Sequence, residues 1–241
     1  IPVDAETLLG ADEVHRLVPS HELLGMTPAS FIESVVESYQ PSVFIEGPDF
    51  RFGKGRAGSI ATLEALGKQN GFAVEVIEPL EVVLADHTIV PARSSLVRWL
   101  LAHGRVADAA LVLERPYQIK AIVESGDKQG RLLGCPTANC GEVDVMLPAD
   151  GVYAGFANSP NGSLHAAAIS IGSKPTFAGQ RRLCEVHLID YDGELDYYDW
   201  SIEVQFSSWI RAQFAFVSEQ SLIDQMKRDV DVCRLRLESV V

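Results

Sequence analysis

The feature that most constrains the fold is a change of hydrophobic pattern near residue 115. Before it, segments with apolar residues at helical spacing, such as 27–39 and 59–71, alternate with short apolar runs. After it, apolar residues recur at every second position in short runs separated by Gly, Pro, Asn and Asp. Because helices and strands have periods of 3.6 and 2 residues, the change predicts two domains, 1–115 and 116–241.

The first half has the element order of a parallel α/β domain. Thr27 and Pro28 are typical of a helix start, which favours a helix over 27–39. The other expected elements are a helix tail at 2–9, strands at 11–20, 42–47 and 72–80, and helices at 59–71, 97–104 and 106–114. A strand, a helix and a second strand of these lengths predict a βαβ unit with parallel strands, whose first strand is buried.

The second half has the pattern of a small all-β domain closed by one helix. Runs of alternating polarity predict strands at 118–125, 143–157, 164–172, 184–193 and 200–206. Several short strands at this spacing favour an antiparallel barrel or sandwich. Ser218, followed by apolar residues at helical spacing and late arginines, predicts a long amphipathic helix at the end of the chain.

Composition and charge limit the possible partners. The 241 residues carry a formal net charge of −13, which argues against nucleic acid or an anionic membrane as partner, because phosphate surfaces attract clustered Lys and Arg. The longest apolar runs are interrupted by charge well before the roughly 20 residues of a bilayer span, and the first residues do not resemble a signal peptide because they are acidic and lack a basic n-region. The four cysteines, 135, 140, 184 and 233, lack zinc-site spacing and are expected as reduced thiols in a cytoplasmic protein.

The segment GKGRAG, Gly53 to Gly58, fits the GxGxxG pattern between an expected strand and an expected helix. Such a loop can bind the pyrophosphate of a dinucleotide, which keeps open a nicotinamide oxidoreductase. However, PDFRF stands between the strand and the first glycine, and its aromatic rings and Arg51 could stack on a flat ring and bind an anion. A plain glycine-rich turn and a different flavin or nucleotide loop are the other interpretations.

The loop from Glu124 to Gly134 contains three glycines around Lys128 and Arg131. Backbone N–H groups of such a loop can surround phosphates, although the Walker A pattern occurs nowhere in the chain. A solvated hairpin is the alternative.

The following PTAN segment offers two neutral side-chain oxygens, those of Thr137 and Asn139. Either these side chains cap their own backbone in a turn, or they complete the coordination of a Mg²⁺ ion that arrives with a nucleotide.

In the expected strand at 184–193, Glu185 and His187 lie on one face, because alternate residues of a strand point to the same side. Glu185 could act as a general base for a hydroxyl group that attacks phosphorus. The alternatives are a paired surface charge for Glu185 and a structural role for His187.

Taken in order, several segments resemble the riboflavin kinase domain: GDKQGRLLGCPTAN, LPADGVYAG, ISIGSKPTF, CEVHLID and SIEVQFSSWIRAQFAF. GPDFRFGKGRAG and the segment from Ser94 to Tyr117 resemble the adenylyltransferase domain that precedes it in bacterial bifunctional riboflavin kinase/FAD synthetases. The resemblance implies a Rossmann-like nucleotidyltransferase α/β domain, followed from about residue 117 by a six-stranded Greek-key barrel with a C-terminal helix.

The resemblance also implies roles for individual residues. Glu185 becomes the catalytic base, and Thr137 and Asn139 become the metal and phosphate ligands. The expected nucleotide cover consists of Gly126, Asp127, Lys128, Gly130, Arg131 and Gly134. The expected flavin contacts are Arg211 and Tyr198 in the kinase half, and Asp49, Phe50, Arg51, Phe52, Arg56, Ser95 and Arg98 in the adenylyltransferase half.

The chain departs from the family pattern in its first half and at two places in its second. It contains no HxGH motif, so we expect the adenylyltransferase domain to lack its first strand. Either the natural protein carries an earlier segment that is absent from this chain, or the protein is a shortened relative. The residues that match the SSTxxR-type motif are Arg93, Ser94, Ser95 and Arg98. In the kinase half, LDYYDW replaces the usual LYG, and Gln213 stands where a glutamate is expected.

These observations predict an enzyme that phosphorylates riboflavin to FMN with ATP and Mg²⁺, while the full-length bifunctional protein adenylylates FMN to FAD. The expected ligands are therefore riboflavin, FMN and ATP or ADP. For the chain as given, we expect FMN formation without FAD formation. A flavin-binding module without catalysis and an NAD-dependent oxidoreductase built on GKGRAG are the alternatives.

Overall fold

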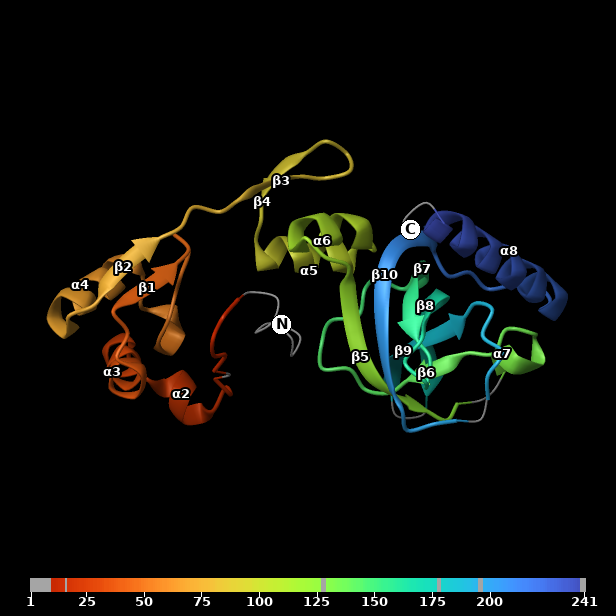
Figure 1. The fold of residues 1–241 in the computed structure, drawn as a ribbon, viewed down its shortest axis with the longest axis horizontal. Coiled ribbons are helices and arrows are strands. Elements are labelled where there is room, and N and C mark those ends of the chain that lie inside the picture. Colours follow the sequence, from red (N-terminus) through yellow and green to blue (C-terminus); the bar gives the residue numbers. More distant parts are fainter. Residues whose placement is uncertain (1–9, 16, 127–128, 177–178, 195–196, 239–241) are drawn as a thin grey trace. The chain divides into compact units, whose positions relative to one another are not determined.

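The protein is described by a computed structural model that covers residues 10–15, 17–126, 129–176, 179–194 and 197–238 (Figure 1). The chain divides into two compact units, Ile1–Leu80 and Glu81–Val241. Each unit has its own cluster of buried apolar side chains.

The first unit contains the predicted βαβ arrangement. Its elements are helix α2 (His21–Gly25), helix α3 (Pro28–Tyr39), strand β1 (Val43–Glu46), the 3-10 turn η1 (Lys54–Arg56), helix α4 (Ile60–Asn70) and strand β2 (Ala73–Val76). Strands β1 and β2 pair in parallel, as expected. Thr27 begins α3 as predicted, because its hydroxyl accepts a 3.1 Å hydrogen bond from the N–H of Ser30.

Three expectations for the first unit are wrong. The described residues of 11–20 form no strand, and β2 ends at Val76 rather than at residue 80. Strand β1 is not buried, since its side chains alternate between exposed and half-buried. The strand expected at 11–20 rested on polarity that alternates over only a few residues, which is weak evidence for a strand. The expected helix tail at 2–9 lies outside the described residues.

The second unit begins with elements that pack on its barrel. Strands β3 (Glu81–Val83) and β4 (Ile89–Pro91) form a hairpin that the sequence pattern did not indicate, and helices α5 (Ser94–Ala102) and α6 (Val106–Leu113) follow as predicted. Side chains of α5 and α6 belong to the same buried cluster as the barrel interior. The chain therefore divides structurally after Leu80, while the sequence-based domain boundary near residue 115 stays a prediction.

The barrel is a closed antiparallel sheet in the order β10-β5-β6-β9-β8-β7. Its strands are β5 (Tyr117–Glu124), β6 (Ala138–Cys140), β7 (Gly151–Asn158), β8 (Leu164–Thr176), β9 (Gly179–Leu188) and β10 (Ser201–Arg211). Strands β7, β8 and β9 are consecutive hairpin neighbours and β10 returns beside β7, which is the order of a Greek key. The predicted six-stranded Greek-key barrel is thus confirmed.

The two faces of the barrel wall have different coverings. Alternate side chains such as Tyr153, Ile169 and Phe206 fill the interior and are fully buried. On the outside, the predicted terminal helix, α8 (Glu219–Glu238), packs on β7 and β8 through Ala154, Cys233 and neighbouring apolar residues (Figure 1). A short helix, α7 (Gln129–Leu132), interrupts the connection between β5 and β6.

Candidate active site

A row of cross-strand neighbours crosses the outer face of the barrel wall, and an irregularity in β10 between Trp209 and Arg211 precedes its last member. Neighbouring strands align one residue each at the same level: Glu124, Asn139, Glu185, Ser170, Val152 and Arg211, from β5, β6, β9, β8, β7 and β10. Registered residues of paired strands point to the same side of a sheet. Because the adjacent residues Cys140, Cys184 and Ile169 belong to the interior core, this row points outward.

Asn139 and Glu185 are direct cross-strand neighbours in this row. The N–H of Gly141 donates to the carbonyl oxygen of Ile122 at 2.8 Å, so the backbone polar groups of Gly141 face β5. Those of Cys140 consequently face β9, and those of Asn139 face β5 again. Asn139 and Glu185 are therefore a non-hydrogen-bonded pair, the kind in which opposed side chains approach most closely.

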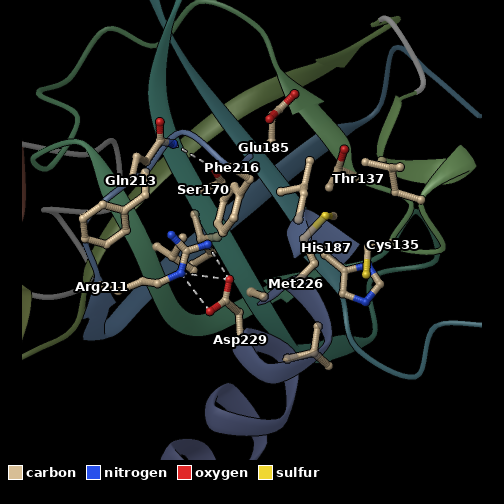
Figure 2. A pocket seen from close by; sticks show the side chains of 18 of the residues that line it. Cys135, Thr137, Ser170, Glu185, His187, Arg211, Gln213, Phe216, Met226 and Asp229 are labelled. Carbon is tan, nitrogen blue, oxygen red and sulfur yellow. Dashed lines mark hydrogen bonds and ion pairs between the residues drawn. The ribbon is translucent and has the colours of Figure 1, made fainter. Parts of the chain in front are cut away.

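A cavity of about 770 Å³ lies over the central part of this row. Its walls are formed by strands β6 to β10, by the α7 segment, by the segment that follows Arg211 and by helix α8. Figure 2 shows Glu185 and Thr137 near each other at one side of the cavity, and Arg211 with Asp229 at another.

On the Thr137 side, backbone approaches side-chain oxygens closely. A Cβ atom at Gly126 would overlap the carboxamide of Asn139, and one at Gly130 would lie 3.3 Å from the Thr137 hydroxyl oxygen and 2.5 Å from the carbonyl oxygen of Cys135. These glycines therefore let the loop lie directly against the PTAN residues.

His187 fixes the start of the PTAN segment. Its Nδ1 lies 2.8 Å from the carbonyl oxygen of Pro136. Because a carbonyl oxygen only accepts hydrogen bonds, Nδ1 carries the proton in this contact. The ring thus connects β9 to the turn that presents Thr137, which agrees with the structural role considered for His187.

At the other end, an ion pair joins β10 to α8. The Arg211 Nε donates to the two Asp229 carboxylate oxygens at 2.9 and 3.1 Å, and its Nη2 donates to Oδ2 at 2.7 Å. Asp229 is only 6% exposed and also accepts a 2.8 Å hydrogen bond from Gln225. The Phe216 ring lies 5.7 Å from the Arg211 guanidinium, within cation–π range. Beside it, the Gln213 side-chain amide donates to the Ser170 hydroxyl at 3.1 Å.

The thiols near the cavity are held in the neutral form. Burial raises the pKa of Cys135, which lines the cavity. Inside the barrel, a hydrogen bond with Cys140, followed by burial, raises the pKa of Cys184. All four cysteines are free thiols, as the sequence predicted.

The structure brings most of the predicted kinase residues together. Glu185, Thr137, Asn139, Gly130 and Arg211 line the cavity, and Gly126 lies against Asn139. Arg131 and Gly134 belong to the same segment without lining the cavity, while Asp127 and Lys128 lie outside the described residues. Tyr198 packs against the barrel core instead, so we leave it out of the proposed flavin site.

The predicted residues of the first half fall into both compact units. Asp49, Phe50, Arg51, Phe52 and Arg56 lie in the first unit, whereas Ser95 and Arg98 lie on α5 in the second. The rings of Phe50 and Phe52 stack with centroids 5.3 Å apart. Strand β1 ends at Glu46 and α4 begins only at Ile60, so GKGRAG is not the tight strand-to-helix turn of a dinucleotide site. This placement removes the support for an NAD-dependent oxidoreductase.

The cavity residues that the sequence analysis missed include Ser170, Phe216 and Asp229, and also Gln213 as a contact. A signal for Asp229 existed, because it lies three residues after Met226 and four before Cys233, on the apolar face of α8. A carboxylate on such a face needs a partner, so it could have been paired with a nearby arginine.

Comparisons with known proteins agree with this geometry. The riboflavin kinase family model matches residues 113–237, which include the barrel, the cavity and α8. The chain belongs to the riboflavin kinase family. The FAD synthetase family model matches residues 7–89, so this family member also carries sequence of the second domain type.

Several curated relatives are named bifunctional riboflavin kinase/FMN adenylyltransferase. The relative from Haemophilus influenzae is 33% identical over 85% of this chain and 64% of its own length. The relatives from Bacillus subtilis and Escherichia coli K12 are 30% and 33% identical over 92% and 91% of this chain, and each is covered to 68%. The chain thus spans about two thirds of these relatives.

A solved structure from Streptococcus pneumoniae, described as a macrolide-efflux protein, superposes with a TM-score of 0.78 and 25% identity. The superposition covers 95% of this chain and 72% of that one, so both units have a counterpart of similar fold. In the part of this chain that the structure describes, no helix has the length and apolar character needed to cross a membrane.

Proposed function

We propose that this chain is a cytoplasmic riboflavin kinase that transfers the γ-phosphoryl group of ATP to the 5′-hydroxyl of riboflavin in the presence of Mg²⁺. The observation that carries the proposal is the cavity itself. At one end it is lined by Asn139 and Glu185 on adjacent strands and by Thr137 directly before β6, and at the other by an aromatic and apolar wall. Phosphates and a flat ring system need these two environments.

The Thr137 end fits a nucleotide with a hard divalent cation. Its side-chain donors are oxygens, which Mg²⁺ prefers, and the glycines at 126 and 130 let the backbone approach the phosphates. We propose that Thr137 and Asn139 bind this metal together with phosphate oxygens. A bound divalent cation would neutralise part of the phosphate charge during transfer.

Glu185 is proposed to be the general base. Its register opposite Asn139 places its carboxylate beside the proposed phosphate site. In the transfer, the hydroxyl oxygen forms a bond to the γ-phosphorus, and the bond from this phosphorus to the β-phosphate oxygen breaks. The hydroxyl proton passes to Glu185, and ADP leaves with the electron pair of the broken bond.

The remaining cavity fits the flavin. Arg211 stands three strands from Glu185 in the registered row, roughly 14 Å along the barrel wall at ordinary strand spacing. Riboflavin, three fused rings joined to a five-carbon chain, can bridge such a distance. Phe216, Met226 and Leu222 line the apolar end. Ser170 and Gln213 lie between this end and Glu185, where the hydroxyl groups of the ribityl chain would pass.

Adenylylation of FMN is a second candidate activity, favoured by the match of residues 7–89 to the FAD synthetase family. The 241 residues contain no HxGH motif, so we propose this activity for a protein in which the motif accompanies these residues. Incubation of FMN with Mg-ATP and chromatographic detection of FAD tests this activity separately from phosphorylation.

The test of the kinase proposal is Glu185→Gln, assayed with riboflavin and Mg-ATP by chromatographic detection of FMN. Loss of the base should lower kcat by about 10²- to 10⁴-fold. Riboflavin binding, followed through quenching of flavin fluorescence, should remain near that of the unaltered protein. Glu203→Gln is the matched control, because Glu203 faces solvent on β10 and contacts Lys120 at 3.7 Å. Near-normal turnover by Glu185→Gln would remove the base assignment.

A further inference from the structure

Asp229 is a buried carboxylate of α8 to which neither the family pattern nor the proposed transfer assigns a task. Its side chain is 8% exposed in the ion pair with Arg211, whose side chain is 19% exposed. Both residues line the cavity. The carboxylate compensates the charge of the arginine, so the pair offers a phosphate less net positive charge than a lone arginine would.

The hydrogen bonds around Arg211 define what it can offer to a ligand. A guanidinium has five N–H groups. The Nε–H and one Nη2–H go to Asp229, and one Nη1–H goes to the carbonyl oxygen of Ala212 at 2.8 Å. Among the described residues, no acceptor binds the other two N–H groups, one on each terminal nitrogen, and Asp229 fixes the plane in which they lie. They can donate to acceptors on a flat, uncharged ligand edge.

Asp229 is itself held in place from its own helix. Gln225, one turn earlier, donates to Oδ1 at 2.8 Å, and Phe216 lies over the guanidinium at 5.7 Å. The pair therefore has one orientation defined by three elements, β10, α8 and the segment between them (Figure 2). Such preorganisation lowers the entropy lost when a ligand binds.

We infer that Asp229 is a positioning residue that makes Arg211 a neutral recognition element for the carbonyl-bearing edge of the flavin ring. The inference rests on the proposed riboflavin site and adds which part of the substrate is read there. It predicts that the ring end of the cavity selects an uncharged heteroaromatic ring with adjacent carbonyl acceptors, and that Asp229 affects flavin binding rather than phosphoryl transfer.

The experiment compares Asp229→Asn with the unaltered chain, using lumiflavin and riboflavin as fluorescent probes. Lumiflavin has the ring system without the ribityl chain, so its binding reports on the ring site even if no phosphorylation occurs. We expect the Kd of both flavins and the riboflavin KM to rise about tenfold, because a hydrogen-bonded charge is lost. We expect kcat at saturating riboflavin and the ATP KM to stay within about twofold.

Two further variants separate positioning from folding. Gln225→Leu keeps both charges and removes only the bond that orients Asp229, so the lumiflavin Kd should rise about threefold. In an Arg211→Gln background, Asp229→Asn should add no further loss, because it acts through the arginine. Asp190→Asn is the matched control. It removes the charge of an exposed carboxylate that lies 2.6 Å from Arg234, and Arg234 is on α8, the helix that carries Asp229.

Unchanged lumiflavin and riboflavin affinity in folded Asp229→Asn would overturn the inference, even if the chain phosphorylates riboflavin. If Asp229→Asn does not fold, an unchanged lumiflavin Kd in Gln225→Leu would overturn the inference instead. Absence of FMN formation together with the expected loss of lumiflavin affinity would instead leave the ring site standing and remove the kinase proposal.

Discussion

The two compact units use their strands in opposite ways. In the second unit, each of the six barrel strands has a neighbour on both sides, and the interior side chain of Phe206 is fully buried. In the first unit, the described sheet has two parallel strands, and Ile45 at its centre is 57% exposed. Closing the barrel thus stabilises its sheet and lets side chains of neighbouring strands align. The open two-stranded sheet of the first unit instead needs α3 and α4 to stabilise it.

The hydrophobic cores of the two units also differ, in size. The larger buried cluster, that of the second unit, extends from α5 and α6 through the barrel interior. The buried cluster of the first unit consists of Ile32, Phe52, Leu63 and Phe72. Because buried apolar area provides most of the stabilisation of a domain, the two units should unfold in separate transitions, with the first unit melting at the lower temperature.

The largest effect that tests this difference comes from Phe206→Ala. The ring packs against Tyr153 with centroids 5.5 Å apart, edge to face, in a fully buried position. Its removal should cost about 3–5 kcal/mol of the free energy of unfolding of the barrel and shift only the upper transition in calorimetry.

Phe72→Ala is the counterpart in the first unit, and it should lower only the first transition while riboflavin phosphorylation persists. A single transition that moves with both variants would show that the units are coupled.

A smaller effect concerns the loop that lies against the PTAN residues. Gly126→Ala places a methyl group where the Asn139 carboxamide stands, so the loop must shift away from the proposed phosphate site. The KM for ATP should rise about tenfold, since the shift weakens hydrogen bonds to a charged group, while the riboflavin Kd is unchanged.

Gly25→Ala is the matched change in the first unit, because no atom lies within 4 Å of an added Cβ there. Steady-state kinetics should show no effect of this control. An equal effect of the two variants would contradict the assignment of the loop to the nucleotide.

The smallest effect involves the hairpin β3–β4 and its contact with α6. Hydrogen bonds from Thr88, and then from Arg105, lower the pKa of Asp86 to about 2. A lowered folded-state pKa means that the stabilisation is present above the pKa of the unfolded chain and is lost as the pH falls toward 2.

Asp86→Asn should therefore reduce the thermal stability of the second unit slightly at pH 7 and flatten its decline between about pH 4 and pH 2. The first unit, whose described residues do not include this pair, should show no change. An unaltered acid profile would show that this surface pair contributes nothing.

Sequence patterns predicted those parts of the protein that repeat over many residues. The alternation of the barrel strands and the periodicity of α8 identified the second unit, and the PTAN and CEVH segments identified most of one end of the cavity. Strand β6, with three residues, and the hairpin β3–β4 are too short to show a period. The pairing of Asp229 with Arg211 was not visible because it joins residues 18 positions apart through tertiary packing.

The strand pairing of the barrel also determines when the barrel can close during translation. Strand β5 leaves the ribosome before its partner β10, and the paired residues Tyr117 and Phe206 are more than eighty positions apart. Contacts of such long sequence separation are slow to form, because much of the chain must be ordered first. Arg211 and Asp229 lie on β10 and α8, which follow the other barrel strands in the sequence. The cavity can therefore form on a nascent chain only after Asp229 has been translated.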